Sequence, residues 1–202
     1  MLTKTKNYGL VVCGGLSSRM GQDKSLLVYH QKSQRYHTRD LLRNFCQETF
    51  ISCNPSQELS IDKRYRTLVD LPRFSGTGPM AALLTAFTQF PHHNIFAIGC
   101  DYPFLTEKDL SAFSTACKSE PIAAAFYHEK SRLYEPLLAY YSHRSAHLLF
   151  QLFERGQHSL QSFLQEVGAA KYFPADERSM NSVDTPEAMT LAKEQQVMIH
   201  SH

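Results

Sequence analysis

The chain has 202 residues, of which 43% are hydrophobic and 20% are charged, with a formal net charge of +2 at pH 7. This composition excludes a disordered or fibrous protein, and the length predicts a single domain over residues 1–202. The 21 basic and 19 acidic side chains are spread along the chain. We therefore expect a small molecule as the partner, and not nucleic acid.

The N-terminal stretch "MLTKTKNYGLVV" contains an apolar run of strand length only, which is too short for a signal peptide. No later run reaches the ~18 apolar residues of a membrane span. These features predict a cytoplasmic protein with no membrane partner. Residues 1–6 and about 197–202 are expected to be frayed tails.

The five cysteines include no C-x-x-C pair, and the ten histidines are scattered. An odd number of cysteines, several at the ends of apolar runs, predicts reduced and buried side chains and no disulfide or zinc site. We interpret the histidines as structural, because pairs such as His92 and His93 lack metal-site spacing to other candidate ligands.

The predicted elements alternate between strands and helices. Apolar runs of strand length occur at 9–13, 48–53, 94–100, 122–126 and 135–141, with a short run ending at Val69. Apolar residues with helical period occupy 38–45, 80–87, 146–153 and 160–167. Thr106 and Asp109 resemble a capping box, and Pro79 and Pro186 each suit the first position of a helix. This order predicts an α/β fold, a mainly parallel sheet covered on both faces.

Ligands of such sheets bind at the carboxyl ends of the strands, which directs attention to "GGLSSRMGQDK" after the first run. Gly14 and Gly15 permit a close backbone approach to an anion, and Arg19 and Lys24 add positive charge. Neither the P-loop pattern nor G-x-G-x-x-G occurs here. The loop therefore predicts a polyphosphate cradle of another kind.

Three more polar residues follow strand-like runs. Asp101 is either a cap for the next turn or a ligand for Mg²⁺ held together with phosphate oxygens. Asp70 is either an acceptor for a guanine edge or ribose hydroxyl, or a turn former before Pro72. Asn54, before Pro55, has the same two interpretations.

Four motifs resemble those of one family. "CGGLSSRMGQDKSLL" is similar to LAGGxSxRMGxDKxLL, "CDYPFL" to CDMPFL, "SGTGPMAAL" to G-x-GPLAGI and "SVDTPEAM" to N-x-NTPEDL. They occur in order across nearly the whole chain, and the first is highly specific. The sequence resembles the MobA-like nucleotidyltransferases, most closely the molybdenum cofactor guanylyltransferases.

The resemblance implies a Rossmann-like three-layer α/β sandwich of the nucleotide-diphospho-sugar transferase type. It implies transfer of GMP from GTP to molybdenum-bearing molybdopterin with release of pyrophosphate, Mg²⁺ as cofactor, and hand-over of the product to molybdoenzymes or their chaperones. The implied catalytic residues are Arg19, Lys24 and Asp101. The implied nucleotide-binding residues are Val12, Cys13, Gly14, Gly15, Lys24, Asn54, Asp70, Gly78 and Asp101, and the implied metal ligands are Asp101 and Asp184.

Three residues depart from the family pattern: Cys13 replaces Ala, Tyr102 replaces Met and Asp184 replaces Asn. The first is a change between small residues, whereas the last adds negative charge near the phosphates. Two alternatives stay open beside the guanylyltransferase: a nucleotidyltransferase that uses CTP or another phosphorylated acceptor, and a non-catalytic nucleotide-binding module. The attacking phosphate is already ionised, so no side-chain nucleophile or dedicated general base is expected.

Overall fold

The computed structural model describes residues 6–13 and 24–183. Seven strands of these residues form one sheet in the order β3-β2-β1-β4-β6-β5-β7. The strands are β1 (Asn7–Val12), β2 (Glu48–Cys53), β3 (Thr67–Val69), β4 (Asn94–Gly99), β5 (Ala123–His128), β6 (Leu133–Tyr141) and β7 (Ala170–Tyr172). The α-helices are α1 (Gln34–Leu42), α2 (Pro55–Glu58), α3 (Met80–Gln89), α4 (Glu107–Ala116), α5 (Ala146–Glu154) and α6 (Leu160–Glu166).

The sheet is mainly parallel. Strands β3, β2, β1 and β4 run parallel to one another, and β7 runs parallel to β5. Among the strands described, β6 alone is reversed, since it pairs antiparallel with both β4 and β5. The carboxyl ends of β1 to β4 and of β5 therefore reach the same edge of the sheet.

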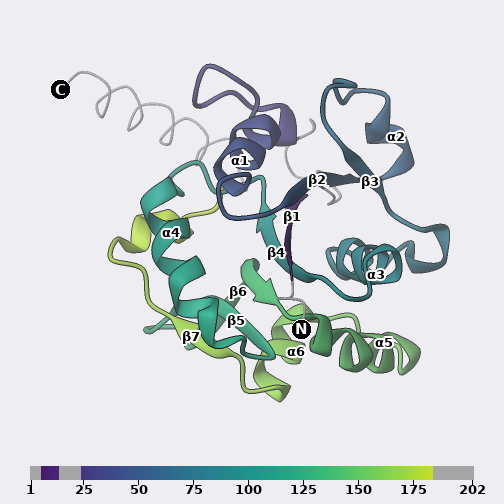
Figure 1. The fold of residues 1–202 in the computed structure, drawn as a ribbon, viewed down its shortest axis with the longest axis vertical. Coiled ribbons are helices and arrows are strands. Elements are labelled where there is room, and N and C mark those ends of the chain that lie inside the picture. The colour runs from purple at the N-terminus through teal and green to yellow at the C-terminus, as the bar shows by residue number, and fades with distance from the viewer. Residues whose placement is uncertain (1–5, 14–23, 184–202) are drawn as a thin grey trace, which may run out of the picture.

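Helices cover both faces of this sheet (Figure 1). Helices α3, α5 and α6 pack on the face that carries Leu10 and Val12 of β1. Helices α1 and α4 pack on the opposite face, which carries Val11. The predicted three-layer α/β architecture is thus confirmed.

Burial on both faces explains why the central strands are almost continuously apolar. All six residues of β4 are buried, and so are the eight residues from Met80 to Phe87 of α3. Leu83 and Leu84 are completely buried. Each such side chain contributes about 1.5–3 kcal/mol through removal of its apolar surface from water.

The predicted strands at 9–13, 48–53, 94–100, 122–126 and 135–141 correspond to β1, β2, β4, β5 and β6, and the short run corresponds to β3. The capping box of α4 is confirmed, because Thr106 Oγ1 accepts from Asp109 N and the Asp109 carboxylate accepts from Thr106 N. Pro186 lies outside the described residues. Lys6 was expected in a frayed tail, but its carbonyl accepts a hydrogen bond of 3.1 Å from Asn94 N.

Two boundaries and two elements differ from the prediction. Helix α1 begins at Gln34, before the expected 38–45 stretch, because its first turn buries the polar side chains of Gln34 and Arg35. Pro79 directly precedes α3 instead of opening it. The short elements α2 and β7 were not predicted.

The five cysteines are free thiols, as expected. Four of them are buried: Cys13, Cys53, Cys100 and Cys117. Cys46 is partly exposed. In the part of the chain that is described, no helix is long and apolar enough to cross a membrane.

Candidate functional site

Polar groups collect where β3, β2, β1 and β4 end. The backbone ladder continues past the strands: Cys13 N donates to Ser52 O over 3.1 Å, Asp70 N to Cys53 O over 3.0 Å, and Cys100 N to Val12 O over 3.2 Å. The residues that follow these strands, Cys13, Asn54, Asp70 and Asp101, therefore lie along one edge. This is the edge at which parallel α/β sheets bind ligands.

Asn54 is the N-cap of α2. Its side-chain oxygen accepts from Gln57 N over 2.9 Å, and Gln57 Oε1 accepts from Asn54 N over 3.2 Å, which completes a capping box. Gln57 Nε2 also donates to the Cys13 carbonyl over 3.3 Å. The cap thus fixes the end of β1, the strand from which the glycine-rich loop departs.

Asp70 lies at the end of β3 with its Oδ1 accepting a hydrogen bond of 3.1 Å from Ser52 Oγ. Burial raises the pKa of the Asp70 carboxyl, and the Ser52 hydroxyl opposes that shift. A half-buried carboxylate with few protein donors has lone pairs left to accept from a ligand. The geometry is therefore that of an acceptor for N–H or O–H groups.

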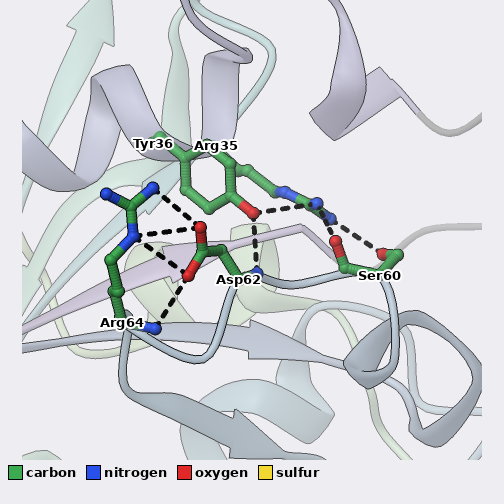
Figure 2. Close-up of polar contacts among 5 residues, drawn as sticks. All are labelled: Arg35, Tyr36, Ser60, Asp62 and Arg64. Carbon is green, nitrogen blue, oxygen red and sulfur yellow. Dashed lines mark hydrogen bonds and ion pairs between the residues drawn. The ribbon is translucent and has the colours of Figure 1, made fainter.

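A polar cluster holds the segment between Asn54 and Asp70 against α1 (Figure 2). Arg35 is almost fully buried; it donates to the carbonyl of Ser60, to Ser60 Oγ over 3.0 Å and to Tyr36 Oη over 3.1 Å. Tyr36 Oη also accepts from Asp62 N over 2.9 Å, and Asp62 pairs with Arg64. These contacts hold the connection between β2 and β3 against the helix layer. They therefore support the edge of the sheet on which Asn54 and Asp70 lie.

Asp101 lies two residues after the end of β4, and Gly99 makes room for its side chain. A Cβ built on Gly99 would lie only 2.5 Å from Asp101 Oδ1. The carbonyl of Asp101 accepts a hydrogen bond of 2.8 Å from Val183 N. Burial, with electrostatic contributions from Cys100 and Asp101, raises the pKa of Tyr29 to about 12.

The segment after Asp101 is clamped from the α1 side. Gln34 Nε2 donates to Tyr102 O over 3.3 Å, and His30 Nε2 contacts Pro103 O at 2.8 Å. The His30 ring stacks on His37 with centroids 3.8 Å apart. Since Gln34 is buried, this clamp is part of the core and fixes the backbone beside Asp101.

Gly78 lies in the loop before α3 with φ +60, in the left-handed region that favours glycine. No described atom lies within 4 Å of a Cβ built on it. The glycine is therefore needed for the backbone conformation and leaves an open approach beside Pro79.

The other predicted site residues are only partly covered. Gly14, Gly15 and Arg19 lie outside the described residues, as does Asp184. Lys24 begins the 3₁₀ turn η1 (Lys24–Leu26), and Val12 is the last residue of β1. The structure thus brings together Val12, Cys13, Asn54, Asp70 and Asp101, with Gly78 at the start of the α3 segment.

For a divalent cation the described residues offer Asp101. No group of three or more His, Cys, Asp or Glu gathers within the described ranges. Mg²⁺ needs no such group, because it is commonly held by one or two carboxylates together with substrate phosphates and water. An aspartate at the strand-end edge fits this donor set.

Sequence reasoning missed Glu135 and His128, which join Tyr102 at this edge. Pro136 was the available signal, because a proline inside a strand run interrupts the ladder and commonly marks a bulge. The predicted strand at 135–141 included it without that interpretation.

A mainly parallel α/β sheet with polar side chains at the carboxyl ends of its central strands has the arrangement of the Rossmann-like folds, which bind their ligands at this edge. The MobA-like NTP transferase domain matches residues 9–171, and the chain belongs to this family. The predicted relationship to the MobA-like nucleotidyltransferases is confirmed at this level.

Individual relatives agree. A molybdenum cofactor biosynthesis bifunctional protein of Synechocystis is 28% identical over 187 residues, which cover 92% of this chain; the chain spans 53% of that longer protein. The molybdenum cofactor guanylyltransferase of Pseudomonas entomophila is 26% identical over 188 residues, which cover 89% of this chain and 94% of the length of that protein. The crystal structure of molybdopterin-guanine dinucleotide biosynthesis protein A from Archaeoglobus fulgidus shares the fold, with a TM-score of 0.78 at 21% identity, covering 95% of this chain and 99% of that chain.

Proposed function

We propose that this chain transfers GMP from GTP to molybdenum-bearing molybdopterin, releasing pyrophosphate and forming the molybdopterin guanine dinucleotide cofactor. The observation that carries the proposal is the strand order β3-β2-β1-β4. It separates Asn54 and Asp70, whose side-chain amide N–H groups and carboxylate suit a base or ribose, from the carboxylate of Asp101. The glycine-rich loop leaves β1 between them, so a nucleotide laid along this edge would have its phosphates beside Asp101.

In the proposed reaction, a phosphate oxygen of the acceptor bonds to the α-phosphorus of GTP. The bond from that phosphorus to the oxygen bridging to the β-phosphate breaks, and pyrophosphate leaves with the electron pair. Lys24 and Arg19 would neutralise the charge on the α-phosphate and on the departing group. Asn54 and Asp70 would hold the nucleoside, so that the reacting atoms stay aligned.

Asp101 would hold Mg²⁺, which when bound supplies positive charge at the phosphates. No side chain has to act as nucleophile in this scheme. The attacking phosphate is ionised at neutral pH, so no general base is required.

Pyrophosphate release tests the proposal. Wild-type protein is incubated with Mg²⁺, molybdenum-bearing molybdopterin and either GTP or CTP, and we expect release with GTP to exceed release with CTP at least ~10-fold. Turnover with CTP alone would overturn the guanine assignment. Turnover only when a sugar phosphate or polyol phosphate replaces molybdopterin would overturn the acceptor.

A pair of carboxylate variants separates catalysis from binding alone. Asp101→Asn should lower release to a small residual rate, whereas Asp109→Asn, which alters only the cap of α4, should keep it. If Asp101→Asn bound nucleotide and fulfilled the cellular role unchanged, the chain would be a non-catalytic nucleotide-binding module.

A further inference from the structure

A chain of three polar side chains lies beside Asp101. Tyr102 Oη donates to Glu135 Oε2 over 2.6 Å, and His128 Nε2 lies 2.7 Å from Glu135 Oε1. The three residues come from the loop after β4, from β6 and from the last position of β5. Both oxygens of the Glu135 carboxylate are therefore engaged, one by each neighbour.

An irregular stretch of β6 brings Glu135 to this place. Ala125 of β5 pairs with Ala139, but the next residue, Phe126, pairs with Glu135, so residues 136–138 have no partner on β5. Pro136 lacks an N–H and cannot donate to the ladder. Its carbonyl accepts a hydrogen bond of 2.9 Å from Tyr141 Oη, which stabilises the irregularity from the core.

These three hydrogen-bonded side chains are connected to Asp101 through the ring of Tyr102. A Cβ built on Gly99 would lie 2.5 Å from Asp101 Oδ1 and 3.0 Å from Tyr102 Cε2. The carboxylate and the ring edge thus pack over the same point of β4. Because the Tyr102 ring is only 6% exposed, its position limits where the Asp101 side chain can lie.

The hydrogen bonds fix the ring at its far end. Without them, the Tyr102 side chain would be held by packing alone. The side chains of Glu135 and His128 are only 23% and 30% exposed. Burial to this degree favours one well-defined arrangement over a mobile surface pair.

We propose that Glu135 is a positioning residue of the transfer reaction: with His128 as its support, it holds Tyr102 against Asp101 and so fixes the Asp101 carboxylate toward the reacting phosphates. The proposal rests on the proposed function, in which Asp101 serves the phosphates. Tyr102 stands where the family pattern has Met, so this device depends on a residue that sets the chain apart from that pattern.

Two tyrosine variants form a matched pair for the test. Tyr102→Phe removes only the hydroxyl that binds Glu135. Tyr134→Phe removes a hydroxyl that donates to Ala169 O over 2.8 Å in the buried core, one position before Glu135 on the same strand. Glu135→Gln keeps an acceptor for Tyr102, whereas Glu135→Ala removes it.

We expect Tyr102→Phe and Glu135→Ala to lower kcat about 10-fold with KM for GTP changed less than about twofold, a loss of the size of one charge-assisted hydrogen bond. Glu135→Gln should recover most of the rate. Tyr134→Phe should lower the melting temperature while kcat stays unchanged. Equal kcat in wild type, Tyr102→Phe and Glu135→Ala would overturn the proposal, as would an equal loss in Tyr134→Phe.

Calorimetry separates this proposal from the proposed function. Mg²⁺ is titrated into each variant saturated with a non-hydrolysable analogue of GTP or of CTP, whichever the wild type binds. Weaker Mg²⁺ binding in Tyr102→Phe but not in Tyr134→Phe supports the positioning role even when molybdopterin is not the acceptor. Equal Mg²⁺ affinity in all variants, or a wild type that binds neither nucleotide, overturns it.

Discussion

Replacing Gly99 with alanine tests the placement of Asp101 with a single methyl group. The new Cβ would lie 2.5 Å from Asp101 Oδ1, 3.0 Å from Tyr102 Cε2 and 3.3 Å from Leu137 Cβ. Carbon contacts are optimal at about 3.5–4.0 Å, so the carboxylate has to move by roughly 1 Å. A displacement of about 1 Å at reacting groups costs ~10²-fold in rate, or ~2.7 kcal/mol.

The assay is kcat/KM for pyrophosphate release in Gly99→Ala, Asp101→Ala and the double variant. We expect Gly99→Ala to lose ~10²-fold, and the same methyl to change the residual rate less than about threefold in the Asp101→Ala background. Gly9→Ala is the matched control, because its Cβ would meet Thr49 Cγ2 of β2 at 3.1 Å and Cys46 Sγ, in the connection before β2, at 3.2 Å. An equal loss in both backgrounds, or an equal loss in Gly9→Ala, would refute the reasoning.

Three further predictions concern stability and reactivity. Burial, together with the charges of His30 and Lys32, lowers the pKa of His37 from 6.5 to about 4. Between these two pH values His37 is protonated in the unfolded chain but neutral in the folded chain, so the wild type loses stability as the pH falls. In urea unfolding, the stability of His37→Gln relative to wild type should therefore rise by about 1–2 kcal/mol between about pH 7 and about pH 4.5, after allowance for solvent screening; no rise would contradict the burial of this ring. Asn54→Ala should lower the stability by about 1 kcal/mol and raise KM for GTP. Ser159→Ala, which removes the N-cap of α6, should lower the stability by the same amount and leave KM unchanged. Equal KM values in the two variants would show that Asn54 does not contribute to nucleotide binding. Burial raises the pKa of the Cys53 and Cys117 thiols to about 12, so native protein should react slowly with a thiol reagent at about pH 8 and unfolded protein rapidly; fast modification of both thiols in the native state would be incompatible with this packing.

The sequence predicted the central strands and most helices because their burial pattern is regular. Strand β7 escaped because it lies at the sheet edge, pairs with β5 alone, and exposes two of its three residues. Helix α2 has four residues, too few to show a period. The start of α1 escaped because Gln34 and Arg35 are buried through hydrogen bonds and not through apolar contact.

The position of a candidate residue at the sheet edge was predictable where one segment carries its own signal. Asp101 and Asp70 each follow an apolar run, so the fold rule for strand ends located them. The link from Tyr102 to Glu135 joins residues 33 positions apart, and the link from Glu135 to His128 joins residues 7 positions apart; both depend on the irregular pairing of β6. Pro136 marks the irregular stretch, but no local pattern specifies which side chains it brings together, because that depends on the register of two strands and the direction of a third.

The reversal of β6 also has a consequence for how the protein tolerates change. Because β5 ends at the same edge as β4, the exposed turn of residues 129–132 opens beside the nucleotide-binding strands without belonging to them. Insertions into such a turn leave the pairing of β1 to β4 untouched. An insertion in this turn would therefore change the surface at this edge of the sheet while β1 to β4 keep their pairing.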